Sequence, residues 1–383
     1  MPRTKFRLLL TVCTFLIIFG FLYLHLFGIQ VIDNQRYTKL KEEQSSAYID
    51  IHQPRGTIYD RHGVPVAISE KKISLFCHPN KINREKLTEN LMRFGITDPA
   101  ITQRILSSNE KFIWVKRFLP PEQFTNIEFP QGFGGIEEYK RVYPFGKLFS
   151  HVVGFCDIDQ KGLEGVERTL NDVLKPEVKR IPLLVDARRK VIRSQENTSD
   201  FHEKSAYLTL DLTIQKIVYE ELAKAYRTYE AKSAMAVVMD VYTGAVLAMV
   251  RFPTFDPNQA GDFPVEFRKN SVVYDSFEPG SVLKPFFAAI AIEKGILSPD
   301  SIIFCENGTF NLGYRVIRDV SSYGELTLTQ VVSKSSNIGI TKVGLMLGDK
   351  ALREGIKNFG FGSPTGIEIL GDENGFVQSK SAW

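Results

Sequence analysis

Cysteine is scarce in this sequence of 383 residues. The four cysteines, Cys13, Cys77, Cys156 and Cys305, do not have the spacing of metal ligands, and no two of them form a C-x-x-C pair. We therefore predict no metal site and no cofactor. The spacing favours four free cysteines acting as small hydrophobic residues, and it leaves one disulfide open as an alternative.

A large net charge, long polar tracts and internal repeats are also missing. The formal net charge of +4 is too small to indicate nucleic acid as a partner. With 43% hydrophobic and 24% charged residues, the composition is typical of packed globular proteins and excludes long disordered regions. The length is sufficient for two domains and additional segments.

One apolar run without charge lies near the N-terminus. Residues 8–28 contain no Asp, Glu, Lys or Arg, and as a helix they would extend ~31 Å, about one bilayer core. The run is bulky to its end and has no A-x-A cleavage site, which argues against a cleaved signal peptide. Arg3, Lys5 and Arg7 precede it, so we predict an uncleaved anchor with a cytoplasmic N-terminus. A buried helix of a soluble core is the alternative.

The first part of the chain after this run has mixed character. Residues 33–50 are polar with scattered apolar positions and suit a helical stalk. Residues 54–69 read as a hairpin, and apolar residues recur with a helical period over 162–174. Residues 186–206 are charged and poor in large apolar side chains, so we place a domain boundary there.

The second part predicts an α+β domain. A short strand leads into a long helix within 207–231, and residues 234–250 read as two strands joined at a Tyr-Thr-Gly turn. Further helices are expected over 281–295 and about 327–347. A hairpin beside several helices is α+β in character and differs from the alternating βαβ pattern.

A serine and a lysine three residues apart raise the question of a nucleophile and its base. This pattern is weak by itself, because it occurs three times, at Ser69–Lys72, Ser108–Lys111 and Ser281–Lys284. Only the last pair begins an apolar helix, where Lys284 lies one turn from Ser281 and burial would lower the pKa of its amine. Backbone N–H groups of that first turn would favour an oxyanion. Alone, the pair still favours a helix-capping serine beside an exposed lysine.

Seven segments, in order, resemble the class B penicillin-binding proteins, and most closely their division-specific, FtsI-type branch. They are PRGTIYDRHGVPVA (54–67), YPFGKLFSHVVGF (143–155), GLEGVE (162–167), LTLDLTIQ (208–215), AVVMDVYTGAVLAMVRFPTFDPN (236–258), FEPGSVLKPF (277–286) and YGELTLTQVVSKSSNIG (323–339). The resemblance implies a cytoplasmic tail (1–7), a transmembrane anchor (8–28), a stalk with an elongated pedestal of dimerisation type (29–200) and a transpeptidase domain (205–383).

The resemblance also implies roles for four residues. Ser281 would attack the carbonyl between the two terminal D-alanines of a peptidoglycan stem, and Lys284 would take its proton. Ser335 would relay a proton to the leaving nitrogen, and Asn337 would bind the substrate backbone and help to hold Lys284. Penicillins would acylate the same serine. Asp319 and the cluster of Arg55, Asp60 and Arg61 are interpreted as structural.

Two departures from the family pattern affect these expectations. Lys269-Asn270-Ser271 stands where the division branch usually has Arg-Asn-Arg, so one positive charge is missing. The family's third motif, Lys-Thr/Ser-Gly, is not recognised, because Lys380-Ser381-Ala382 has no glycine and follows Asn337 too closely. We therefore expect a chain that is truncated inside the catalytic domain and is inactive as it stands.

The partners implied by the resemblance are peptidoglycan stem peptides with their lipid-linked precursor, β-lactams, the membrane, and division proteins that include a polytopic glycan polymerase. The implied location is the bacterial inner membrane, with a single pass and the bulk of the chain outside the cytoplasm. Two alternatives remain at this stage: an elongation-specific relative with the same chemistry, and a membrane-anchored scaffold or penicillin sensor without turnover.

Overall fold

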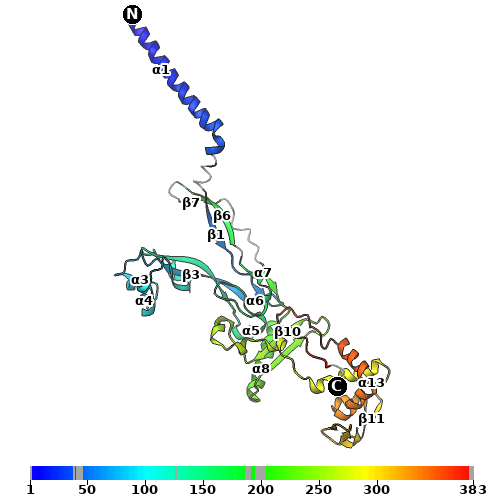
Figure 1. The fold of residues 1–383 in the computed structure, drawn as a ribbon. Coiled ribbons are helices and arrows are strands. Elements are labelled where there is room, and N and C mark those ends of the chain that lie inside the picture. The colour runs from blue at the N-terminus through cyan, green and yellow to red at the C-terminus, as the bar shows by residue number, and fades with distance from the viewer. Residues whose placement is uncertain are drawn as a thin grey trace. The chain divides into compact units, whose positions relative to one another are not determined.

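The computed structural model describes residues 2–37, 39, 46–125, 127–176, 178–185, 191–194 and 204–378 (Figure 1). The chain divides into two compact units, each built from separate stretches of sequence. The first comprises Met1–Gly56, Ser69–Lys140 and Lys175–Lys204, and the second comprises Thr57–Ile68, Arg141–Leu174 and Ser205–Trp383. Of the boundary predicted over 186–206, residues 186–190 and 195–203 lie outside the described part.

The predicted N-terminal helix is confirmed. Helix α1 (Pro2–Phe27) continues into one π-helical stretch, η1 (Gly28–Ile32). Residues Arg7–Ile32 have a mean hydropathy of 2.3 and are not buried by the rest of the protein, so this helix is long and apolar enough to cross a membrane. The hydroxyls of Thr11 and Thr14 donate to the carbonyls one turn earlier, at 2.7 and 2.8 Å, which satisfies these polar groups within the helix.

The helical stalk predicted over 33–50 is wrong for residues 46–50. Strand β1 (Ser46–His52) runs antiparallel to β6 (Val178–Val185), which also pairs with β7 (Val191–Ser194). The sequence SAYIDIH is rich in β-branched and aromatic residues, which favour a strand once a partner strand is available. That partner lies far away in the sequence, so local periodicity did not reveal it.

The rest of the first unit has its own core. Strand β4 (Ile113–Leu119) pairs with residues 73–77 of β3 (Pro65–Cys77), and buried residues such as Leu75, Leu91 and Ile105 fill the space behind them. Helix α4 begins at Pro99, capped by the Asp98 carboxylate on the Ala100 N–H at 2.9 Å. The remaining elements are α3 (Leu87–Arg93), α4 (Pro99–Ser107), η2 (Pro121–Phe124) and β5 (Phe133–Val142).

The second unit contains two large hydrophobic cores and a smaller cluster of Ala223, Val250 and Phe252. The elements around the first are β2 (Ile58–Tyr59), the start of β3, η3 (Gly146–Leu148), α5 (Ser150–Val153), α6 (Gly165–Thr169), α7 (Asn171–Leu174), β8 (Ala206–Tyr207), α8 (Leu212–Thr228), β9 (Ala234–Met239), β10 (Val246–Phe252), η4 (Pro257–Asp262), α9 (Val265–Arg268) and α10 (Ser271–Tyr274). The predicted hairpin is confirmed as the antiparallel pair β9–β10. The continuous helix predicted over 162–174 is two short helices, α6 and α7.

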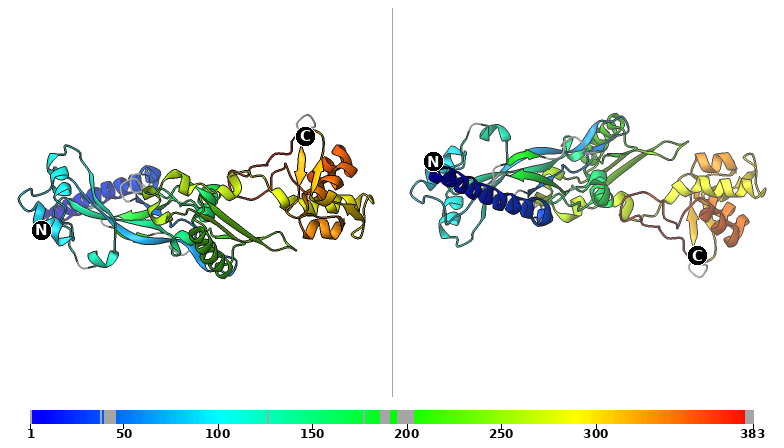
Figure 2. Two further views of the ribbon diagram at one scale, coloured as in Figure 1. Left: turned by 90° about the horizontal axis from the view of Figure 1, so that it is seen from below. Right: turned by 90° about the horizontal axis from the view of Figure 1, so that it is seen from above.

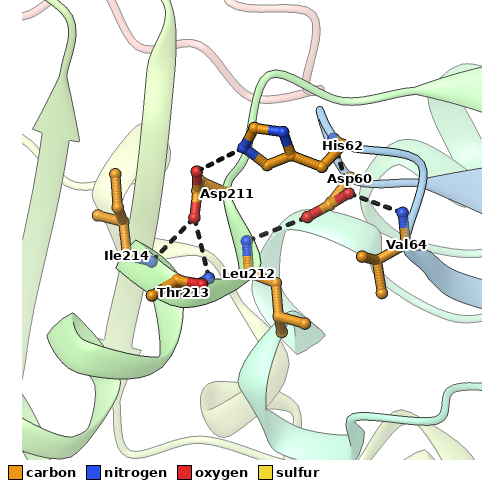
Figure 3. A network of polar contacts seen from close by, with 7 residues as sticks. All are labelled: Asp60, His62, Val64, Asp211, Leu212, Thr213 and Ile214. Carbon is orange, nitrogen blue, oxygen red and sulfur yellow. Dashed lines mark hydrogen bonds and ion pairs between the residues drawn. The ribbon is translucent and has the colours of Figure 1, made fainter.

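A network of backbone contacts fastens the β2–β3 turn to the start of α8 (Figure 3). The Asp60 carboxylate accepts hydrogen bonds from the N–H groups of His62 and Val64 at 2.8 Å, and from that of Leu212 at 3.2 Å. Asp211 caps α8 through the N–H groups of its first turn, and its other oxygen lies 3.0 Å from Nε2 of His62. Asp60 therefore holds this turn through backbone N–H groups; the ion-pair knot with Arg55 and Arg61 that the sequence suggests stays a prediction.

The second core of this unit is mostly helical. Helix α11 packs against α12 and α13 around buried Ile290, Ile303 and Val343, and these yellow and orange elements lie together in both views of Figure 2. The elements are η5 (Gly280–Leu283), α11 (Lys284–Glu293), β11 (Ile302–Phe304), η6 (Glu306–Gly308), β12 (Thr309–Asn311), β13 (Val316–Arg318), β14 (Glu325–Thr327), α12 (Leu328–Ser333) and α13 (Asn337–Asn358). β11 pairs with β14 and β12 pairs with β13.

The helix limits predicted in this core need two corrections. The helix expected from residue 281 begins as the 3-10 turn η5, and α-helical geometry starts only at Lys284, with Pro285 in its first turn. The helix expected over about 327–347 is broken after Ser333 and restarts at Asn337. Both interruptions fall on residues of the predicted active site.

The cysteines do not form disulfides. Cys77 and Cys305 are buried, Cys156 is half-buried, and Cys13 is exposed on α1; all four are free. Burial raises the pKa of the Cys77 thiol to about 11, so this thiol is neutral at ordinary pH. The interpretation of free cysteines, most of them enclosed by the fold, is therefore confirmed.

Candidate active site

The lysine of the predicted pair is the first residue of α11 and is buried. Only 7% of Lys284 is exposed, although the neighbouring residues Ser281 and Val282 are exposed. A proline at the second position of α11 costs no hydrogen bond, because the first N–H groups of a helix have no partner within it. The short 3-10 turn therefore places the serine at the surface and the lysine beneath it.

The second predicted motif forms the break between α12 and α13. Thr327 starts α12 with a capping box, in which its hydroxyl accepts from Gln330 N–H and the Gln330 side chain accepts from Thr327 N–H. After α12 ends, Ser335 adopts φ +54°, a left-handed conformation that costs a non-glycine residue about 1–2 kcal/mol. Ser336 then caps α13 by accepting from Gly339 N–H at 2.9 Å.

A glycine is required where α13 passes α12. A Cβ atom on Gly339 would lie 2.6 Å from a methyl group of Val331 and 3.1 Å from the hydroxyl of Ser336. Val331 and Ser336 are both fully buried, so neither side chain has space to move away. The sequence Ser-Asn-Ile-Gly thus allows the second helix to restart close against the first.

Three of the four predicted site residues are joined at the lysine ammonium. Lys284 Nζ donates to the backbone carbonyl of Ser335 at 2.5 Å, to Ser335 Oγ at 3.0 Å and to Asn337 Oδ1 at 2.7 Å. The orientation of the Asn337 amide is fixed by its other end, because Nδ2 donates to the carbonyl of Arg318 at 2.9 Å. The left-handed turn at Ser335 thus presents a carbonyl and a hydroxyl to the same lysine.

These contacts determine what the amine can do after it loses a proton. An ammonium has three donors, and the three contacts use all of them. A neutral amine keeps two donors, enough for the carbonyl of Ser335 and the amide oxygen of Asn337, and gains one lone pair. The hydroxyl of Ser335 is the one partner that can also donate, so a proton can pass between it and Lys284.

The surroundings act on the pKa of Lys284 in opposite directions. Burial lowers this pKa from its usual value, because a desolvated ammonium is less stable, and the negative charge of Asp319 raises it to a smaller extent. The result is a lowered pKa, the direction expected from the sequence. A lower pKa makes the neutral amine, which is the form that accepts a proton, more accessible.

Ser281 lies one helical turn before the lysine. Its side chain is exposed in η5, and it is not among the three atoms that bond to Lys284 Nζ. Phe277, four residues before the serine, is exposed. Gly280, directly before the serine, has φ +56°, a value suited to glycine in a tight turn. The structure therefore brings Lys284, Ser335 and Asn337 together and leaves Ser281 open to the surface beside them.

Sequence reasoning did not foresee the part played by Asp319. One carboxylate oxygen accepts from Ser336 Oγ at 2.6 Å, and the other accepts from the N–H groups of Asn337 and of Ile338, the latter at 3.0 Å. Asp319 follows β13 and lies 17 residues before Ser336. A short Arg-Asp-Val sequence in a loop carries no periodic signal for such a contact.

Ser271 stands where the family's division branch usually has an arginine, and in this structure the arginine of another element, Arg251, contacts it. Arg251, at the end of β10, is 8% exposed, and its Nε donates to the hydroxyl of Ser271 at 2.6 Å. The same guanidinium donates to the carbonyls of Pro253, Glu266 and Phe267. The guanidinium of Arg251 on β10 therefore contacts Ser271 at the start of α10, which the sequence did not predict.

Other predicted features fall outside the site or outside the described residues. The sequence Lys380-Ser381-Ala382, interpreted as a chance likeness to the third motif, lies outside the described part of the chain. In the part that is described, no group of three or more His, Cys, Asp and Glu side chains could hold a metal ion. Ser69 donates to the carbonyl of Arg55, and Ser108 accepts from Glu110 N–H, so both have local structural partners.

Two family models match the chain and together cover most of it. Residues 50–206 match the penicillin-binding protein dimerisation domain, and residues 234–383 match the penicillin binding protein transpeptidase domain. The chain is 31% identical to the probable peptidoglycan D,D-transpeptidase PbpC of Pseudomonas aeruginosa, over 100% of this chain and 68% of the relative. It is 30% identical to the peptidoglycan D,D-transpeptidase FtsI of Escherichia coli, over 93% of this chain and 62% of the relative.

Solved structures give the same result. Penicillin binding protein 3 of Mycobacterium tuberculosis matches 87% of this chain and 58% of its own, with a TM-score of 0.58 and 27% identity. A peptidoglycan synthetase from Bifidobacterium adolescentis matches 88% of this chain with a TM-score of 0.63 at 19% identity, which supports the fold alone. With an N-terminal apolar helix, a dimerisation domain and transpeptidase-domain sequence up to residue 383, the chain belongs to the class B penicillin-binding proteins.

Proposed function

We propose that this protein, in its full-length form, is a peptidoglycan D,D-transpeptidase that forms a serine acyl-enzyme on D-Ala-D-Ala stem peptides and is acylated by penicillins. The observation that supports this most directly is the buried Lys284, whose amine contacts Ser335 and Asn337 beneath an exposed Ser281. In this proposal Ser281, Lys284 and Ser335 are catalytic and Asn337 binds substrate.

In the first half-reaction, Ser281 Oγ attacks the carbonyl of the penultimate D-alanine while Lys284, as the neutral amine, accepts the serine proton. The carbonyl oxygen becomes an oxyanion, for which the backbone N–H of Ser281 would supply one hydrogen-bond donor. The proton then passes from Lys284 through the Ser335 hydroxyl to the leaving nitrogen. An ester forms on Ser281, the peptide bond breaks, and D-alanine leaves.

In the second half-reaction, the amine of a neighbouring stem peptide attacks the ester carbonyl. Lys284 accepts a proton from this amine, directly or through Ser335, and returns it to Ser281 Oγ as the ester breaks. The products are a cross-linked peptide and the regenerated serine. In a penicillin the β-lactam amide takes the place of the D-Ala-D-Ala bond, and its nitrogen stays attached after the ring opens.

We further assign the chain to septal cell-wall synthesis during division, in the bacterial inner membrane. This assignment is supported by the segments 162–167 and 323–339 and by the relatives named FtsI. The proposed organisation is a cytoplasmic tail (1–7), an anchor (8–28), a stalk and pedestal (29–200) and the transpeptidase domain (205–383). Proposed partners are lipid-linked peptidoglycan precursor and division proteins that include a glycan polymerase; an elongation-specific role is the alternative.

The proposal is tested by labelling membranes that contain the full-length protein with a fluorescent penicillin. We expect a labelled band at the mass of the protein that disappears in Ser281→Ala. Labelling should be at least about 100-fold slower in Lys284→Ala, because a general base usually contributes about 10²–10⁴-fold. Ser108→Ala is the matched control, because it removes the serine of another Ser-x-x-Lys pair. Labelling that survives Ser281→Ala would refute the assigned nucleophile.

A further inference from the structure

We propose that residues 361–373 form a strap that positions the nucleophile, because one end of this segment contacts α11 just after Ser281 and the other end contacts α10 just before it. The inference rests on the proposed function, in which Ser281 is the attacking group. It assigns a role to a loop that contributes no residue to the Ser-x-x-Lys and Ser-x-Asn motifs. Because the strap acts on the serine through α10 and α11, its residues are positioning residues.

The position of Ser281 depends on the backbone on either side of it. Within the part of the chain that the structure describes, its hydroxyl has no hydrogen-bond partner. On the C-terminal side, α11 is buried in the second core through Ala288 and Ile290. On the N-terminal side, α10 packs on the first core through Val272 and Val273. Ser281 therefore lies on a connection between two cores, and its position depends on how both ends of that connection are held.

The strap begins on the helix that carries the base. The rings of Phe361 and Phe286 meet edge to face with their centroids 5.2 Å apart, an arrangement that aromatic pairs favour. Phe286 follows Lys284 by two residues on α11, and Phe361 also packs on the second core. This end of the strap is thus fixed to the helix that starts at Lys284.

The other end of the strap is held against α10. The N–H of Glu373 donates to the carbonyl of Val273 at 3.0 Å. The ring of Tyr274 lies directly on Gly371, because a Cβ atom on this glycine would be 2.1 Å from two of the ring carbons. Any larger residue at position 371 would therefore displace either the ring or the strap.

Between its two ends the strap has a defined shape. The carboxylate of Asp372 accepts hydrogen bonds from the hydroxyl of Thr365 at 3.0 Å and from the N–H of Gly366 at 2.9 Å. These bonds close a loop in which Ile367 and Ile369 pack on the first core. A closed loop has fewer conformations than an open chain, so the strap is a structured second link between the two cores, beside the one that carries the nucleophile.

The ring of Tyr274 passes this hold on to the segment before the serine. Lys269 Nζ lies 5.5 Å from the centre of this ring and is paired at 2.6 Å with Asp275, the first residue after α10. The strap, the ring and the residue from which the chain leaves for Ser281 are therefore in one set of contacts. A displacement of about 1 Å in such a set can slow a reaction by about 100-fold.

The kinetic test measures acylation of the full-length, detergent-solubilised protein by a fluorescent penicillin. We expect Gly371→Ala to lower the maximal acylation rate about 10–100-fold, with little change in the penicillin concentration that gives half of that rate. Gly375→Ala is the matched control, because this glycine also has a left-handed φ, +68° against +92°, and a Cβ atom there meets nothing within 4 Å. Equal rates in Gly371→Ala and wild type, or equal losses in the two glycine variants, would overturn the proposal.

Variants of Tyr274 test whether its ring is the partner of the strap. Tyr274→Ala should slow acylation to a similar extent, and Tyr274→Phe, which keeps the ring, should not. In the double variant Tyr274→Ala/Gly371→Ala the new methyl group meets no ring, so the rate should equal that of Tyr274→Ala alone. Losses that multiply in the double variant would contradict the assigned contact. Simple loss of folded protein is recognised separately, because it lowers the fraction that is finally labelled and leaves the rate unchanged.

Amide hydrogen exchange of the same protein gives a measurement that does not depend on activity. In Gly371→Ala we expect faster exchange in peptides that cover residues 271–283 and 361–373, and unchanged exchange in α12. Unchanged exchange over residues 271–283 would show that the strap does not hold the segment of the nucleophile. If the full-length wild type is not acylated by penicillin, the proposed function fails, whereas the exchange experiment still decides the role of the strap.

Discussion

Among single residues, Glu167 is a charged side chain that the fold encloses completely. Its side chain is fully buried, and Oε1 accepts from Nε of Arg141 at 2.6 Å and from the hydroxyl of Tyr143 at 3.4 Å. Burial, and then the negative charge of Glu167, raise the pKa of Tyr143 well above its usual value, so the phenol remains a donor. A carboxylate in such a place is stable only while its partners are present.

We predict that Glu167→Ala destabilises the protein by about 3–5 kcal/mol, because it leaves the buried guanidinium of Arg141 without its main counter-charge. Glu167→Gln, which keeps an acceptor of the same size, should cost less. Urea unfolding of the solubilised protein measures both. Glu138→Ala is a suitable control, since its ion pair with Arg117 is partly exposed and its loss should cost no more than about 1 kcal/mol. Equal losses in the two alanine variants would contradict this view.

At the scale of secondary-structure elements, side chains that cap helix N-termini fix where several helices begin. Asp98, Asp211, Thr327 and Ser336 each accept from an N–H group in the first turn of the helix that follows. The cap at Asp211 is also part of the network that joins α8 to the β2–β3 turn (Figure 3). A change at this one carboxylate therefore affects two elements.

The Asp211 cap leads us to predict a pH dependence of the protein's stability. The N–H of Ile214 first, and then His62 and the N–H of Thr213, lower the pKa of the Asp211 carboxyl below its usual value. Its charge therefore stabilises the folded state above the unfolded pKa of about 3.9, and this contribution is lost as the pH falls through the lower folded value. At neutral pH, the free energy of unfolding of the wild type should exceed that of Asp211→Asn by about 0.3–1 kcal/mol.

The measurement is urea unfolding of both proteins between neutral pH and about pH 3. Asparagine caps a helix about as well as aspartate, so the variant keeps the hydrogen bonds and loses only the charge. The difference between the two proteins should shrink as the pH falls below about 4. A difference that is constant over this range would show that the charge contributes nothing. Repeating the comparison in His62→Ala isolates the part due to the histidine.

Elements with a local signal were predicted well, and the breaks between them were not. The hairpin over 234–250 and the helix after Asp211 follow from alternation and capping, which depend on nearby residues. The turn at Ser335 is hydrogen-bonded to Arg318, the last residue of β13, and to Asp319, which follows it; both lie outside the helical segment. Apolar periodicity continues across 327–347, so the sequence alone favoured one uninterrupted helix.

The same distinction applies to the candidate site. Spacing alone did not select Ser281 and Lys284; the resemblance of seven ordered segments to a known family selected Ser281, Lys284, Ser335 and Asn337. The structure joins the last three by hydrogen bonds. The sequence could not show that the ammonium uses all three of its donors, or that Arg251 supplies a guanidinium to Ser271. These depend on side chains from separate elements meeting in three dimensions, which spacing does not encode.

At the scale of the whole molecule, the apolar helix α1 decides where the two units can be. A helix of this length and hydropathy, unburied by the rest of the chain, is stable in a bilayer and exposes a large apolar surface in water. The substrate proposed for Ser281 lies outside the cytoplasm. The orientation of α1 is therefore a condition for the proposed function, and it depends on the charges that flank the helix.

We predict that residues 1–7 stay in the cytoplasm because Arg3, Lys5 and Arg7 precede the apolar run. A phosphatase that folds only after export, fused at the end of the chain, should be active, and a fluorescent protein that folds only in the cytoplasm should be dark at the same place. Replacing the three basic residues by glutamate should reduce phosphatase activity. Replacing Lys81, Lys86 and Arg93, which lie far from the apolar run in the sequence, should not. An inactive phosphatase with a bright fluorescent fusion would reverse the assigned orientation and place Ser281 on the wrong side of the membrane for its proposed substrate.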